Sequence, residues 1–217
     1  MPYPYMIGPD DDGAYRIAFN KSLKIFQRLT PPLIAHNTGC PFDARTQLFT
    51  ITSFGQTFDV SWPDGTVCFS QTTLKPEIGW RLIVLNYFSA ATVLPLSGKW
   101  VSYKDQPQGA IFYPNIRTHV IEPMGLFYDT CDKKSLKRAL PQVGFSCFDD
   151  KADLTADAFF APRIPVRIQF WAGDDEFPGS FQILFDQTIS EQMHIEDSAL
   201  LCDLVAFLLR TQSSNHF

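Results

Sequence analysis

The sequence predicts an α+β fold in which antiparallel strands pack against a buried central helix and a C-terminal amphipathic helix. Three patterns predict it: a strand hairpin that leads into a helix over 163–210, a helix over 76–91 that is apolar on nearly all sides, and a strand meander over 47–70. A half-apolar hairpin and an amphipathic helix bury each other, as α+β folds require. The 217 residues contain no internal repeat or low-complexity linker, so a single domain over 1–217 is expected.

The N-terminal half is expected to begin with an irregular segment over 1–9, which is rich in Pro and Tyr. A helix is predicted over 13–29, with three aspartates at 10–12 favoured at its start by the helix dipole and Pro31-Pro32 ending it. Alternating apolar residues then predict three strands, which are 47–54, 58–62 and 67–70. The helix over 76–91 is so evenly apolar that it should be buried centrally.

Prolines divide the middle of the chain into short predicted elements. Short helices are predicted over 110–120, 124–130 and 133–140, separated by Pro114, Pro123 and Pro141. We expect an extended piece within 95–103, a loop over 142–150, and one more turn of helix within 153–160.

Two segments near the C-terminus, 166–171 and 181–186, alternate with a period of two and predict a hairpin. Their apolar faces coincide only if Ile168 lies opposite Ile183, because a one-residue slip would expose the apolar side chains of the second strand. The same register pairs Gln169 with Gln182 and places Asp186 diagonal to Arg167, within reach of a salt bridge. The helix that follows carries an apolar stripe made of Ala199, Leu200, Leu201, Leu204, Val205, Leu208 and Leu209.

Composition argues against several functional classes. The net charge of −5 and the pI near 5.3 do not favour nucleic acid as a partner, because phosphate binding needs a basic surface. No apolar run is long enough for a membrane span, and the N-terminus lacks a signal-peptide pattern, so a cytoplasmic protein is expected. The five cysteines include no C-x-x-C pair, which argues against a disulfide framework, a zinc ribbon or an iron–sulfur cluster.

The first candidate site is the loop W-A-G-D-D-E-F over 171–177. Its carboxylates, Asp174, Asp175 and Glu176, are the oxygen ligands that Ca²⁺ or Mg²⁺ prefers. The loop lacks the alternating ligand spacing of an EF-hand. The favoured interpretation is therefore a solvated turn in which Asp side chains accept hydrogen bonds from neighbouring backbone N–H groups.

The second candidate site combines Asp186, His194, Glu196 and Asp197. Carboxylates beside a histidine can serve acid–base chemistry or hold a metal. The favoured interpretation is helix capping together with the Arg167–Asp186 pair. A third candidate, in which Trp62, Trp100 and Trp171 line a planar-ligand pocket, competes with ordinary burial of aromatic residues. Nucleotide-binding glycine motifs, the G-x-S-x-G elbow and H-E-x-x-H are absent from the sequence.

Several runs resemble an uncharacterised prokaryotic family, domain of unknown function 3786. They are R-I-P-V…F-W-A-G-D-D-E-F-P…I-L-F-D…I-E-D over 163–197, I-V-L-N-Y-F…P-L-S-G-K-W-V-S-Y over 83–103, and the segment over 109–113. The resemblance implies a cytoplasmic protein of largely anaerobic bacteria or archaea. It also implies that some relatives lie beside, or fused to, iron–sulfur and corrinoid proteins of one-carbon metabolism. The signature positions that it implies are Trp171, Gly173, Asp174, Glu176, Phe177, Asp186, Glu196 and Asp197.

The family has no established activity, so the resemblance supplies no catalytic residue and no cofactor. This chain lacks the cysteine-rich segment of the fused members, which puts a direct redox role in doubt. We therefore expect a non-catalytic accessory or binding domain whose partner is a corrinoid or iron–sulfur protein. The alternatives are a metal-assisted enzyme that uses the carboxylates of the C-terminal unit, and a homodimeric structural module.

Overall fold

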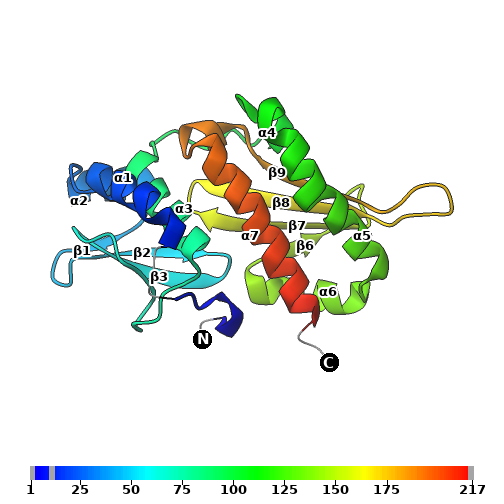
Figure 1. The fold of residues 1–217 in the computed structure, drawn as a ribbon, viewed down its shortest axis with the longest axis horizontal. Coiled ribbons are helices and arrows are strands. Elements are labelled where there is room, and N and C mark those ends of the chain that lie inside the picture. Colours follow the sequence, from blue (N-terminus) through cyan, green and yellow to red (C-terminus); the bar gives the residue numbers. More distant parts are fainter. Residues whose placement is uncertain (1–2, 10–12, 215–217) are drawn as a thin grey trace.

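The computed structural model describes residues 3–9 and 13–214 and confirms the α+β class (Figure 1). Within these residues the strands form a four-stranded sheet, ordered β1-β2-β3-β4, and a five-stranded sheet, ordered β5-β9-β8-β7-β6. Every strand pair is antiparallel. The three aspartates at 10–12, predicted to favour a helix start, lie outside the described residues.

The four-stranded sheet contains β1 (Phe42–Asp43), β2 (Leu48–Ser53), β3 (Gln56–Ser61) and β4 (Val67–Phe69). The five-stranded sheet contains β5 (Trp100–Ser102), β6 (Ser146–Phe148), β7 (Leu154–Ala161), β8 (Ile164–Trp171) and β9 (Ser180–Asp186). The α-helices are α1 (Arg16–Phe26), α2 (Pro31–Thr38), α3 (Ile78–Ala90), α4 (Gly109–Ile116), α5 (Glu122–Thr130), α6 (Lys133–Ala139) and α7 (Ile195–Ser214). None of the helices in these residues is long and apolar enough to cross a membrane.

Helix α3 is the buried centre of the fold, as its apolar sequence predicts. Nine of its 13 residues are buried, and it contacts α1 and α7. The Trp80 side chain is fully buried and its indole N–H donates to Ser53 Oγ over 2.9 Å. The helix begins at a cap in which Glu77 Oε2 accepts the Gly79 N–H over 2.7 Å.

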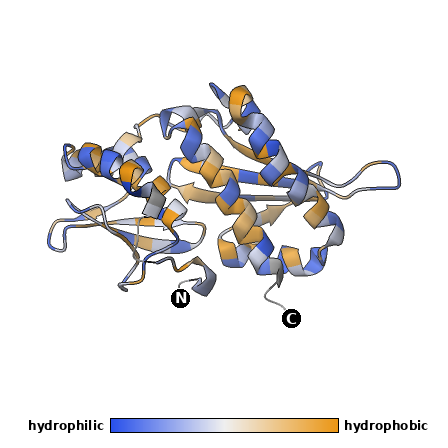
Figure 2. Ribbon diagram, viewed as in Figure 1, coloured by the Kyte–Doolittle hydropathy of each residue, from blue (hydrophilic) through white to orange (hydrophobic). Residues whose placement is uncertain are grey.

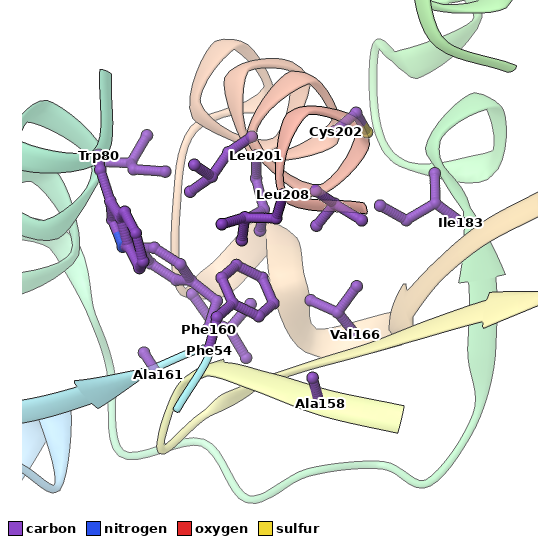
Figure 3. Packing of buried hydrophobic residues seen from close by; sticks show 14 of the residues in the cluster. Phe54, Trp80, Ala158, Phe160, Ala161, Val166, Ile183, Leu201, Cys202 and Leu208 are labelled. Atoms are coloured by element: carbon purple, nitrogen blue, oxygen red, sulfur yellow. The ribbon is translucent and has the colours of Figure 1, made fainter. Parts of the chain in front are cut away.

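Helix α7 covers one face of the five-stranded sheet. Its Leu201 and Leu208 point toward Phe160 and Val166 of the sheet, with Trp80 of α3 alongside (Figure 3). Hydrophobic residues run along α7 and the strands behind it, whereas the loop between β8 and β9 is largely hydrophilic (Figure 2). The predicted amphipathic role of the C-terminal helix is therefore confirmed.

The predicted hairpin register is also confirmed, because Ile168 pairs with Ile183 and Gln169 with Gln182. The predicted Arg167–Asp186 salt bridge is wrong. Arg167 instead makes two hydrogen bonds of 2.7 and 2.8 Å to Asp157, which lies directly opposite it on β7. Both carboxylates lie on strands next to β8, but a charge directly opposite is closer than a charge on the diagonal.

The prediction of a turn of helix within 153–160 is wrong, because residues 154–160 belong to strand β7. Two alanines at 156 and 158 favour helix locally, but pairing with β8 on one side and β6 on the other overrides that preference. The predicted loop over 142–150 likewise contains strand β6.

Prolines do not separate the helices as predicted. A continuous helical stretch runs from Gly109 to Thr130, and a π-helical segment, η4 (Arg117–Ile121), joins α4 to α5. Pro123 is the second residue of α5, which directly follows this π-helical segment. Pro31 similarly opens α2, a helix that the sequence analysis did not predict.

The two sheets meet where the β2–β3 turn crosses the loop before β6. The Phe54 N–H donates to the Phe159 carbonyl of β7 over 2.9 Å, and the Phe54 ring stacks on Phe145. A Cβ atom on Gly144 would lie 2.5 Å from the Gly55 nitrogen, so only glycine permits this approach. Gly144 also has a positive φ of 78°.

Substituting Gly144→Ala should therefore destabilise the protein much more than Gly98→Ala. Gly98 has a similar φ of 72° but open space around its Cβ position, so it reports the backbone strain alone. We expect about 1–2 kcal/mol for that strain in both variants and about 1–3 kcal/mol more for the overlap at Gly144. Urea unfolding monitored by circular dichroism measures both, and equal losses would contradict a tight crossing.

Candidate functional site

The loop that joins β8 to β9 projects from one end of the five-stranded sheet (Figure 1). Within it, Asp174 Oδ1 accepts the N–H groups of Glu176 and Phe177 over 2.9 and 2.8 Å, and the Asp174 N–H donates to the Phe177 carbonyl. The hydrogen bonds from Phe177 and Glu176 hold the pKa of Asp174 below its ordinary value. This confirms that Asp174 forms a turn with neighbouring backbone N–H groups.

The base of the same loop is held by Asp129, at the C-terminal end of α5. Its Oδ1 accepts the Gly173 N–H over 2.8 Å, and its Oδ2 accepts the Gly179 N–H over 2.6 Å. These two bonds lower the pKa of Asp129. A single carboxylate therefore clamps both ends of the loop, which we call the clamped loop (173–179).

The sequence analysis missed Asp129, since it is 44 residues or more from its loop partners. The glycines near Asp129 and its partners were the sequence feature that could have indicated this close contact. A Cβ atom on Gly125 of α5 would lie 2.2 Å from the Gly179 carbonyl oxygen, and one on Gly179 would lie 2.3 Å from Asp129 Oδ1. Bare backbone at these positions lets α5 approach the loop closely.

The tip of the clamped loop carries an exposed aromatic ring next to two acidic residues. Phe177 is 68% exposed, and the side chains of Asp175 and Glu176 are exposed beside it. Trp171 is half-buried at the end of β8, and Gly173 begins the loop. Among the described residues, His, Cys, Asp and Glu do not gather in threes in a way that could hold a metal ion.

Asp186, from the second candidate site, is 3% exposed and saturated with hydrogen bonds. Its carboxylate accepts the N–H groups of Ser97, Gly98 and Thr188, together with two hydroxyl groups. Burial alone would raise the pKa of Asp186, but these bonds outweigh burial and keep the pKa below its ordinary value. Asp186 therefore ties the end of β9 to the loop before β5.

Asp197 belongs to a different network. Its Oδ1 accepts the side-chain N–H of Asn86 on α3 over 2.6 Å, and Asn86 also bonds to Ser22 of α1. Burial raises the pKa of Asp197, while Asn86 and the nearby His194 oppose that shift. His194 and Glu196 are exposed at the start of α7. Asp186 and Asp197 share no hydrogen-bond partner in the part of the chain that the structure describes.

The three tryptophans do not line one pocket. Trp62 follows β3 of the four-stranded sheet and packs against the core, whereas Trp100 and Trp171 lie on β5 and β8 of the other sheet. Trp100 covers the Arg167 guanidinium at 4.3 Å, and Phe148 covers it at 4.8 Å. These rings shield the Arg167–Asp157 pair on the sheet face opposite to α7.

The model of the family described as Domain of unknown function (DUF3786) matches residues 30–207, which is most of the chain. The chain belongs to DUF3786. The matched DUF3786 region contains Asp129, the clamped loop, Asp186 and Asp197. Searches of curated proteins and of solved structures gave no match.

Removing the clamp should loosen the loop without unfolding the protein. In Asp129→Ala, the amides of Gly173 and Gly179 lose their acceptor, so hydrogen exchange at these two amides should become faster. The core strand β8 should keep its protection. Asp175→Ala is the matched control, because that exposed carboxylate lies in the same loop but makes no hydrogen bond to Gly173 or Gly179. Equal exchange in the two variants would contradict the clamp.

Asp186→Asn should lower stability at neutral pH by about 1–3 kcal/mol, because an amide cannot accept all of these N–H groups. The folded-state pKa of Asp186 is depressed, so its contribution is present above the unfolded value and is lost as the pH falls through the folded value. The native protein should therefore lose its advantage over Asp186→Asn below about pH 4. Urea unfolding across pH 2–7 tests this, with Asp175→Asn as the exposed control. A stability difference that does not depend on pH would contradict it.

Proposed function

We propose that this protein is a non-catalytic accessory domain that docks on another protein through the clamped loop. One observation carries the proposal: a 68% exposed phenylalanine stands at the tip of a loop that two aspartates hold in shape. A pre-ordered loop loses less conformational entropy when it binds. Aromatic residues are also over-represented among the side chains that dominate binding energy.

The charge of the tip favours a particular kind of partner surface. Asp175 and Glu176 directly precede Phe177, and the whole chain carries a net charge of −5. The complementary surface is an apolar pocket with a basic rim, and such charge pairing should speed association at low salt. From the family resemblance we propose that the partner is a cytoplasmic corrinoid or iron–sulfur protein of one-carbon metabolism.

A metal-assisted enzyme is the second candidate. The observation that favours it is Asp197, a buried carboxyl group with a raised pKa near His194. Perturbed carboxyl groups of this kind are frequent in active sites. Metal analysis and an absorption spectrum of protein purified without oxygen test it. A stoichiometric metal that is lost in Asp197→Asn but retained in Asp174→Asn would favour the enzyme over the docking domain.

Docking through the loop predicts that Phe177→Ala weakens binding to the partner about tenfold or more, as removal of a central aromatic contact does. The measurement is calorimetric titration of a purified corrinoid methyl-transfer protein, and separately of its iron–sulfur partner, with this chain. Phe159→Ala is the matched control, since Phe159 is 50% exposed but lies on β7.

Equal weakening by both substitutions, or no binding to either protein, would contradict the proposed partner. Analytical sedimentation of the chain alone tests the remaining alternative, a homodimeric structural module. A stable dimer that Phe177→Ala dissociates would mean that the loop docks on a second copy of the chain instead.

A further inference from the structure

A cleft of about 320 Å³ lies between the N-terminal segment, the start of α3 and the outer face of α7. Its apolar lining includes Met6, Leu200, Leu204 and Phe207, and its two carboxyl groups belong to Glu77 and Asp203. The volume falls at the lower end of the range for small-molecule sites, about 300–1,000 Å³. The cleft does not include the clamped loop.

The walls of the cleft are held in place. The N-terminal segment pairs with the residues before α3, because the Glu77 N–H donates to the Met6 carbonyl over 2.7 Å and the Gly8 N–H to Lys75 over 3.0 Å. Tyr5 packs against Phe207 of α7 with ring centroids 6.2 Å apart, and its hydroxyl bonds to Gln212. The cleft is therefore enclosed by elements that hydrogen bonds and ring contacts hold together.

The charge of the lining is one-sided. Lys, Arg and His are absent from the described residues that line the cleft, whereas both of its charged side chains are carboxylates. One Glu77 oxygen accepts the Gly79 N–H, which leaves its other oxygen for a ligand. Partial burial raises the pKa of Asp203, which is exposed overall, and His119 of η4 and Arg210 of α7, both outside the lining, oppose that shift.

Such a site suits a cation with an apolar body. An ammonium group gives the two carboxylates a counter-charge and can also lie over the face of the half-exposed Phe207 ring. A carboxylate ligand would meet like charge, and a purely apolar ligand would leave Asp203 without a cation in the cleft.

We propose that this cleft binds a small amphiphilic amine, with its apolar tail on Met6, Leu200 and Leu204 and its ammonium group at Glu77 and Asp203.

The test uses three probes of equal chain length: hexylamine, hexanol and hexanoate. Each is titrated into the full chain at neutral pH and followed by protein-observed NMR. Hexylamine should bind more tightly than hexanol, and hexanoate should bind weakest, with shifts centred on residues 200–207. Equal binding of the three probes, or shifts elsewhere, would overturn the proposal.

Substitutions in the cleft distinguish the contribution of charge to amine binding from that of apolar packing. Asp203→Asn should weaken hexylamine about fivefold, as loss of one partly exposed ion pair does, and leave hexanol unchanged. Glu196→Gln is the matched control, because Glu196 is an exposed carboxylate on the same helix outside the cleft. Phe207→Ala should weaken both hexylamine and hexanol. An equal effect of Asp203→Asn and Glu196→Gln on hexylamine would refute the amine site, without bearing on the clamped loop.

Discussion

The apolar surface of α3 is the constraint on which the rest of the structure depends. A helix that is hydrophobic on nearly every side must be covered on every side. Here α1, α7 and the four-stranded sheet provide that cover, and Trp80 connects α3 to the sheet through Ser53. Because one helix is shared in this way, the buried side chains of the N-terminal and C-terminal parts form a single cluster.

Burial against a common core also explains why glycines occur where two elements pack closely together. Gly144 lets the two sheets touch, and Gly125 lets α5 reach the loop after β8. At both crossings a Cβ atom would fall well inside van der Waals contact with backbone atoms. Tight packing of this kind leaves little freedom to the neighbouring loops. The clamped loop is restricted in this way where Gly125 of α5 packs against Gly179.

Features that depend on local periodicity, such as the hairpin register, could be predicted from the sequence. Features that depend on residues far away in the chain could not. Ile168 and Ile183 could be paired because strand alternation has a period of two and only one register buries both faces. Strand β7 was mistaken for helix because its alanines have no strand preference of their own, and only β6 and β8 on its two sides make it a strand. For the same reason Asp157 escaped notice as the partner of Arg167, and Asp129 as the clamp.

The distribution of carboxylates follows a physical rule that bears on function. Asp129, Asp174 and Asp186 each accept two or three backbone N–H groups, which keeps them ionised and fixes the loops around them. Asp129 and Asp186 use both carboxylate oxygens in these bonds, which leaves them little capacity for a ligand. The carboxylates that retain capacity are those at exposed edges, at the loop tip and at the cleft beside α7. Glu77 both caps α3 and lines the cleft, so Asp203 is the lining carboxylate whose substitution should alter binding while leaving the fold intact.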